Sequence, residues 1–280
     1  MIDKSPKKTS ILSFNLLGIK NKATISRLDK RLTHITDFLR QSSFDIVCLQ
    51  EVSYPVYCTL ESFCHSNSME LHPPKSIWKD LGQDFIITVL LSRYKVSHSD
   101  FFSLPPFVPN KNYTMNFCRV HKLWVANIHL FNGYKNKQTR LEQLLFIIKK
   151  LKEKTSNTDP LLLCGDFNTD FDHKDSSSFI KHLRTELSLV DLWQILHPKT
   201  KGPTQDPQKN PLRLLIKPNS STKRVDAVFI RDKFLKAHKI SLCLDTEIFK
   251  EKTCLLNKKN EAIFFPSDHF AVAAEILYFA

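Results

Sequence analysis

The sequence predicts a single-domain α/β protein, because strand-like apolar runs alternate with helical patterns along most of its length. At 280 residues the chain is long enough to bury a large core. Its composition, 42% hydrophobic and 25% charged, is that of an ordinary globular protein. No break in composition marks a second domain, so we expect one domain over residues 9–280 after a flexible segment at residues 1–8.

The N-terminal half is predicted to begin with a strand, a helix and a second strand. Residues 9–15 and 45–50 are apolar runs of strand length. Between them, apolar side chains recur at helical spacing, at Ile25, Leu28, Leu32, Ile35, Phe38 and Leu39. Further strands are expected over residues 85–92 and 123–130.

The C-terminal half continues the alternation. A helix is predicted from Leu141 to Leu151, followed by a strand over residues 161–165. The spacing of Phe179, Ile180, Leu183 and Leu187 predicts one more helix. Residues 198–218 are rich in Pro, Lys and Asn and have no period, which indicates a long loop. Strands over 225–230, 240–244 and 270–277 would complete the sheet structure.

The net charge of the chain indicates which class of partner it binds. A formal net charge of +13 and a pI near 9.4 favour polyanions, nucleic acid first and an anionic membrane surface second. The longest apolar run, residues 85–91, is far shorter than the roughly 20 residues that span a bilayer. Seven cysteines without a CxxC pair, and a start without an apolar signal region, predict a reducing, cytoplasmic compartment, although export without a cleaved signal stays open. We also expect a monomer.

Polar residues recur at the ends of the expected strands, where a rigid sheet holds side chains within reach of a substrate. They are Asn15, Glu51, His129, Asp166, Asn168, Asp226, Asp268 and His269. Taken singly, several have a structural explanation: Asn15 could close a turn, Glu51 could be solvated, and His129 could be a core histidine. Asp226 is harder to explain in this way, since a buried carboxylate needs a partner.

Two segments carry the sharpest signal. In the GDFN segment, alternation along an extended chain turns Asp166 and Asn168 to the same side, and Gly165 permits close approach of backbone or ligand. In the SDH segment, Asp268 and His269 are adjacent and therefore diverge. Asp268 could then face a metal while His269 reaches a substrate phosphate.

Several short segments, read in order, are similar to the motif series of the endonuclease/exonuclease/phosphatase superfamily: SFN, LQEV, NIHL, GDFN, RVDAVF and SDHF. The resemblance runs from Asn15 to His269. It implies a four-layered α/β sandwich, in which two packed mixed β-sheets are flanked by helices and the site lies at one end. It also implies hydrolysis of a phosphodiester by metal-assisted attack of water.

The resemblance implies a metal site and its ligands. Glu51 would be the principal Mg²⁺ ligand, with Asn15 and Asp268 near the ion. These oxygen donors suit a hard cation such as Mg²⁺, with Mn²⁺ as a substitute, whereas the thiol and histidine spacings of zinc sites are missing.

The resemblance also implies roles around the phosphate. Asp166 would orient and deprotonate the attacking water, and Asn168 would hold the phosphate. His129 and His269 would contact phosphate oxygens, with Asp226 bonded to His269. A histidine paired with a carboxylate keeps its proton near neutral pH, which suits it to developing negative charge.

The motifs specify the substrate less closely than they specify the reaction. Thr204, Asp206 and Asn210 resemble a substrate-binding element of 5′-tyrosyl-DNA phosphodiesterases, and also one of neutral sphingomyelinases. Both families usually place Trp where this chain has Gln205. We expect a nuclease or DNA-end-processing enzyme first, and a sphingomyelinase-like phospholipase C second, with residues 101–102 and 104–108 as its apolar membrane patch. A non-catalytic phosphate-binding scaffold ranks third.

Overall fold

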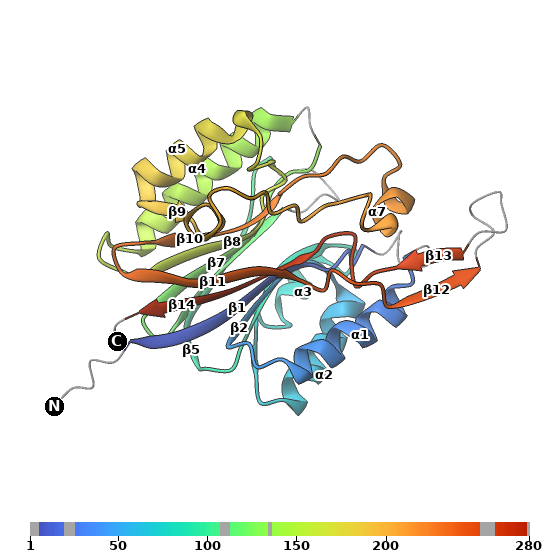
Figure 1. The fold of residues 1–280 in the computed structure, drawn as a ribbon. Helices are drawn as coiled ribbons and strands as arrows, with labels where there is room; N and C mark the ends of the chain where they lie inside the picture. Colours follow the sequence, from blue (N-terminus) through green and yellow to red (C-terminus); the bar gives the residue numbers. More distant parts are fainter. Residues whose placement is uncertain (1–5, 20–25, 107–112, 134–135, 253–260, 279–280) are drawn as a thin grey trace.

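The computed structural model describes residues 6–19, 26–106, 113–133, 136–252 and 261–278. Two six-stranded mixed sheets pack face to face, and helices cover both outer faces (Figure 1). This is the four-layered α/β sandwich that the sequence predicts. Among the described residues, no helix is both long and apolar enough to cross a membrane.

The first sheet has the strand order β11-β14-β1-β2-β4-β3. Its strands are β1 (Lys7–Asn15), β2 (Ile46–Ser53), β3 (Glu70–His72), β4 (Ile86–Ser92), β11 (Leu235–Cys243) and β14 (Ala271–Tyr278). β1 is parallel to β2 and antiparallel to β14. The outer face of this first sheet packs against α1 (Leu28–Gln41), α2 (Tyr54–Ser66) and α3 (Ile77–Leu81).

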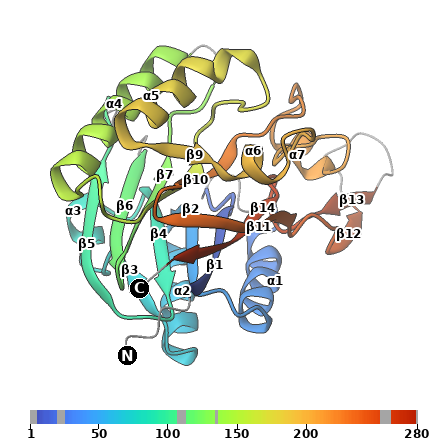
Figure 2. The same cartoon turned by 60° about the vertical axis from the view of Figure 1, so that its left-hand side comes forward.

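The second sheet has the strand order β5-β6-β7-β8-β10-β9. Its strands are β5 (Val96–Ser103), β6 (Thr114–Val120), β7 (Leu123–His129), β8 (Leu161–Asp166), β9 (Leu189–Asp191) and β10 (Asp226–Arg231). β7 and β8 are parallel. The outer face of this second sheet is covered by α4 (Lys137–Lys154) and α5 (Ser177–Leu187). These two helices lie side by side, on the opposite side of the molecule from α1 (Figure 2).

Smaller elements complete the described structure. A 3₁₀ turn, Lys174–Ser176, precedes α5, and α6 (Leu192–Leu196) follows β9. A short helix, α7 (Pro211–Ile216), lies near β12 (Phe249–Lys252) and β13 (Glu261–Phe264), which form a separate hairpin.

The central strands are apolar without alternation because both of their faces are buried. In β1, Ile11 faces the other sheet while Leu12 packs toward the helices. In β8, Leu162 faces the other sheet while Leu161 and Leu163 pack toward α4 and α5. Strands buried on both sides are expected to be near-continuous hydrophobic runs, which explains why the sequence located them.

The sequence did not predict the peripheral elements. β5 is an edge strand whose residues are mostly half-buried and mixed in polarity, so it has no clear period. The predicted loop over residues 198–218 contains the short helix α7, whose first residue is Pro211. β1 begins at Lys7, inside the segment expected to be flexible.

The suggested apolar membrane patch is partly accounted for by packing. Phe101 and Phe102 each pack partly against an outer layer of the core, and Leu104 is buried. Phe107 and Val108 lie outside the described residues.

Candidate active site

The sheet topology brings the predicted polar residues to one end of the sandwich. Asn15 ends β1, and His129 ends β7. Asp166 ends β8, where it is in register with His129 on one side and with Asp226 on the other. β10 is antiparallel to β8, so its first residue, Asp226, lies at the same end of the sheet as the last residue of β8. β14 is antiparallel to β1, so His269, which lies just before β14, is at this end as well.

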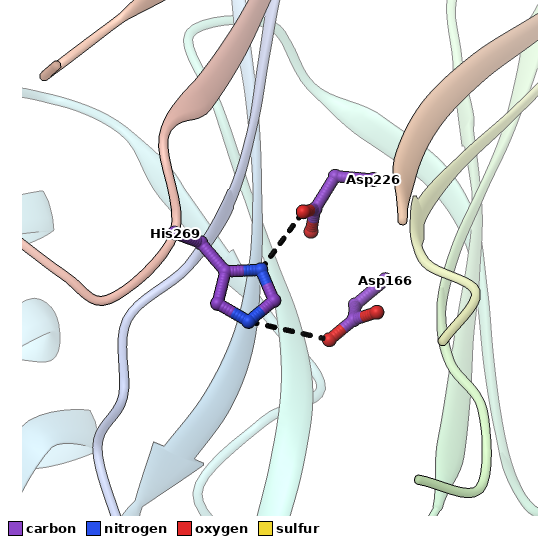
Figure 3. A group of neighbouring side chains, drawn as sticks. All are labelled: Asp166, Asp226 and His269. Atoms are coloured by element: carbon purple, nitrogen blue, oxygen red, sulfur yellow. Dashed lines mark hydrogen bonds and ion pairs between the residues drawn. The ribbon is translucent and has the colours of Figure 1, made fainter. Parts of the chain in front are cut away.

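A buried histidine joins two aspartates at the centre of this site (Figure 3). His269 donates from Nδ1 to Oδ2 of Asp226 at 2.8 Å, and its Nε2 lies 3.9 Å from Oδ2 of Asp166. Candidate metal-ligating atoms of the three residues all lie within 4.8 Å of one another. Burial alone would lower the pKa of His269, but the charge and hydrogen bond of Asp226 outweigh it and raise this pKa to about 10. Asp226 therefore favours the protonated form of this imidazole.

Asn15 links the two sheets. Its Nδ2 donates to Oδ2 of Asp166 at 2.9 Å and to Oε1 of Glu51 at 3.2 Å. His129 lies 3.6 Å from Asp166 and 3.9 Å from Glu51, measured from its Nε2 to the nearest carboxylate oxygen. Asn15 thus holds one carboxylate from each sheet in a fixed relation.

Negative charge is crowded at this end. Burial and then the neighbouring charge of Asp268 raise the pKa of Glu51 to about 7. Burial and then the charge of Asp226 raise the pKa of Asp166. Burial lowers the pKa of His129, which favours its neutral form. Among the described residues, no partner donates a hydrogen bond to the buried Oε2 of Glu51. We call Glu51, Asp166, Asp226 and Asp268 the carboxylate cluster.

Backbone geometry also aims these groups. Glu51 has a φ of 55°, in the left-handed region, beside an irregularity in the pairing of β2 with β4. A Cβ atom on Gly18 would lie 2.1 Å from the carbonyl oxygen of Glu51, so only glycine fits there. A Cβ atom on Gly165 would lie 2.0 Å from the carbonyl oxygen of Ile128. The close approach predicted at Gly165 is therefore present.

Asn168 follows Asp166 as expected and shares its site. Its backbone N–H donates to Oδ1 of Asp166 at 2.8 Å, and its Nδ2 donates to the carbonyl of Leu130 at 2.8 Å. The second bond fixes the Asn168 side chain against the end of β7, and the first fixes the carboxylate of Asp166.

Asp268 is paired with an arginine that sequence reasoning missed. Arg213, in α7, donates from Nη1 to Oδ2 of Asp268 at 2.5 Å. Although burial raises the pKa of Asp268, the charges of His269 and Arg213 outweigh it and lower this pKa. Arg213 lies in the aperiodic stretch of residues 198–218, where no periodic signal could reveal it.

The three predicted substrate-binding residues lie beside the site and bond the protein's own backbone. The hydroxyl of Thr204 accepts from the backbone N–H of Val225 and of Asp226, both at 3.1 Å. Asn210 donates to the carbonyl of Ser267 at 2.8 Å, and Asp206 accepts from the N–H of Gln208 at 3.0 Å. In this structure Thr204 and Asn210 support the segments that carry Asp226 and His269.

Comparison with known proteins identifies the family of this chain. The model of the Endonuclease/Exonuclease/phosphatase family matches residues 12–269. The chain belongs to this family. Members of the family are metal-dependent enzymes that hydrolyse phosphoester bonds, so the predicted superfamily and enzyme class are confirmed. No curated protein matches the chain in sequence.

Solved structures share the fold of this family member at low sequence identity. Zebrafish (D. rerio) TDP2 complexed with single strand DNA product is 18% identical with a TM-score of 0.72, over 96% of this chain and 99% of that one. A mannosyl-6-phosphatase of Bacteroides thetaiotaomicron is 19% identical with a TM-score of 0.69, over 96% and 100%. The human Nocturnin catalytic domain with bound sulfate anion is 17% identical with a TM-score of 0.68, over 100% and 95%.

Beside the carboxylate cluster, this family member has a pocket of about 560 Å³. The side-chain Nε2 of Gln205, one of its lining residues, lies 2.7 Å from Nε2 of His269. The lining also includes Asn168 and several cationic residues: Lys137, Arg140, Arg213, Lys217 and Lys223. Sequence reasoning missed these cations individually, because lysine and arginine are frequent throughout the chain.

Proposed function

We propose that this protein is a Mg²⁺-dependent phosphodiesterase that acts on nucleic acid. One observation carries the proposal: a buried histidine paired with Asp226 and a group of carboxylates whose charge is only partly compensated lie together beside a pocket lined by cations. Phosphodiester hydrolysis needs charge neutralisation, a positioned water and stabilisation of the leaving oxygen, and this arrangement offers groups for each.

The residues present fit a hard divalent cation. The buried Oε2 of Glu51 has no hydrogen-bond partner among the described residues, and its pKa is raised to about 7. Asn15 and Asp268 would complete an oxygen donor set, as Mg²⁺ or Mn²⁺ prefers. When bound, the ion supplies Lewis acidity and neutralises charge on the phosphate.

The chain's own residues perform the proton and charge chemistry. Asp166, held by Asn15 and by the N–H of Asn168, accepts the proton of the attacking water. When protonated, His269 would donate from Nε2 to a phosphate oxygen in place of its contact with Gln205, and Asp226 stabilises its charge. Asn168 orients the phosphate on the side of the pocket.

The lining of the pocket favours nucleic acid over sphingomyelin. A phosphocholine headgroup carries a quaternary ammonium, which proteins bind over aromatic faces. No Phe, Tyr or Trp occurs among the described residues that line the pocket, and its cations would repel the ammonium. The net charge of +13 likewise favours a polyanion.

A panel of substrates tests the proposal. Metal-free protein is assayed with Mg²⁺, Mn²⁺ or Zn²⁺ on single-stranded DNA, duplex DNA, RNA, 5′-phosphotyrosyl DNA and sphingomyelin vesicles, beside Glu51→Ala. We expect hydrolysis of nucleic acid with Mg²⁺ or Mn²⁺, none in EDTA, and no restoration by Zn²⁺. Full turnover in EDTA would refute the metal requirement, and hydrolysis of sphingomyelin alone would favour the phospholipase alternative.

A further inference from the structure

The cationic pocket beside His269 has no assigned ligand. We propose that it binds a second phosphate group of the substrate, so that the preferred substrate carries a phosphate on a nucleoside adjacent to the scissile phosphodiester. This inference rests on the proposed function and adds the recognition of a second anionic group. The pocket's volume of about 560 Å³ lies within the range typical of ligand sites.

Arg140 is the anchored part of this second-phosphate pocket. It is only 6% exposed, and its Nε and Nη1 donate to Thr169 and to the carbonyls of Phe131 and Gly133. None of the described residues accepts a hydrogen bond from its Nη2. A buried guanidinium that is fixed on one side and unpartnered on the other is suited to a phosphate oxygen.

Two lysines add charge without competing partners. Lys137 and Lys223 line the pocket, and the described residues include no carboxylate in an ion pair with either ammonium group. One carboxylate, that of Asp170, lines the pocket, and its Oδ1 accepts from the backbone N–H of Asp172 and of Arg224. The lining therefore has a surplus of positive charge, as a dianionic phosphate monoester requires.

The pocket is continuous with the proposed site of hydrolysis. Gln205 lines it and is bonded to His269, and Asn168 lines it and is bonded to Asp166. A substrate with its scissile phosphate at His269 would therefore place its neighbouring group in the pocket. Because the lining has no Phe, Tyr or Trp among its described residues, that group is recognised by charge rather than by stacking of a ring.

Binding without turnover tests the pocket directly. Calorimetry compares thymidine 3′,5′-bisphosphate with thymidine 5′-monophosphate, on wild type and on Lys137→Ala/Lys223→Ala. We expect the bisphosphate to bind about tenfold more tightly to wild type, the gain typical of a charge-assisted contact, and this preference to disappear in the variant.

The matched control removes the same charge elsewhere. Lys95 and Lys122 are exposed and lie by the turns at the other end of β5 and β7 from His129. Lys95→Ala/Lys122→Ala lowers the net charge equally and should keep the preference for the bisphosphate. Loss of the preference in both variants would show a general charge effect and overturn the assignment.

Kinetics separates this inference from the proposed function. The dinucleotides TpT, pTpT and TpTp are compared at fixed Mg²⁺ and salt. A higher kcat/KM for one phosphorylated dinucleotide, reduced toward that of TpT in Lys137→Ala/Lys223→Ala, supports the pocket. Equal rates for all three, with equal binding of the two nucleotides, would overturn it while phosphodiesterase activity stands. No hydrolysis of any dinucleotide would count against the proposed function, and the binding comparison would still decide the pocket.

Discussion

Two groups of buried charged side chains lie near the start of β10, and their charges are balanced differently. Arg224 contacts a carboxylate oxygen of Asp172 and one of Asp191, each at 2.8 Å, and we call these three residues the Arg224 network. Although burial lowers the pKa of Arg224, the charge of Asp191 and the other contacts outweigh it and raise this pKa. In the carboxylate cluster, like charges are neighbours, and the pKa of Glu51 is raised to about 7.

The difference shows what each group does. A buried ion pair whose partners match keeps its charges in the folded state and costs stability when one partner is removed. A cluster with surplus negative charge is destabilising in isolation and becomes favourable when a cation or a phosphate-bound cation is present. Local strain at Glu51 fits the second case, since strained backbone is concentrated at functional sites.

The largest effect is expected at Asp166. Asp166→Asn keeps the shape of the side chain but removes the base, so kcat should fall by about 10²–10⁴-fold. The melting temperature should not fall, since one of several neighbouring negative charges is removed. Steady-state kinetics and circular dichroism on the same preparation measure both. Wild-type rates in the folded variant would show that Asp166 does not accept the proton.

The same substitution in the Arg224 network should have the opposite outcome. Asp191→Asn leaves Arg224 with one carboxylate and is expected to lower the free energy of unfolding by about 3 kcal/mol. The folded variant should retain most of its kcat. Urea unfolding and kinetics measure the two quantities. Unchanged stability with lost activity would mean that the two groups are not distinct in role.

The raised pKa of Glu51 predicts a pH-dependent stability in metal-free protein. The folded state holds the Glu51 proton up to about pH 7, whereas the unfolded state releases it near its ordinary value of 4.5. Stability contributed by Glu51 should therefore decline as pH rises from 4.5 through 7, by on the order of 3 kcal/mol. Glu51→Gln should match wild type in melting temperature near pH 4.5 and exceed it at pH 8.

Mg²⁺ should reverse that order, because it stabilises wild type and not Glu51→Gln. Melting curves from pH 4.5 to 8, with and without millimolar Mg²⁺, check the prediction. Parallel curves for the two proteins would exclude Glu51 as the source of surplus charge.

The smallest effect is the coupling between Asp226 and His269. If the two act as one unit, Asp226→Asn/His269→Ala should be little slower than His269→Ala alone, with a coupling energy of about 0.5–3 kcal/mol. Values of kcat/KM and melting temperature for the two single variants and the double variant measure it. Multiplicative losses in rate would mean that Asp226 supports the fold independently, as Asp191 does.

The sequence located the buried centre of the molecule better than its periphery. Its apolar runs coincide with β1, β2, β4, β7, β8, β10 and β14, since these strands are buried on both faces or nearly so. The edge strand β5, the hairpin of β12 and β13, and helix α7 went unpredicted, and so did the buried strand β6 and helix α2. The half-exposed residues of β5, the hairpin and α7 satisfy no single period, and their conformation depends on contacts with distant segments.

For the site, the order of residues along the chain was sufficient to select candidates, because strand-end polar groups in a motif series are visible locally. The structure brings Asn15, Glu51, His129, Asp166, Asp226 and His269 together, as predicted. It adds Arg213 and Gln205, which contact Asp268 and His269 from an aperiodic segment. No local signal distinguishes these two from other polar loop residues.

The sequence by itself determined the layered α/β class, the family and the residues with chemical capacity at strand ends, because burial on both faces and short polar motifs are local properties. Only the tertiary structure decided how those residues are charged and what lies beside them. Contacts such as Asn15 with Asp166, 151 positions apart, and the cationic lining around Arg140 depend on the packing of two sheets. A pKa and a pocket are properties of distances between side chains, which sequence spacing does not specify.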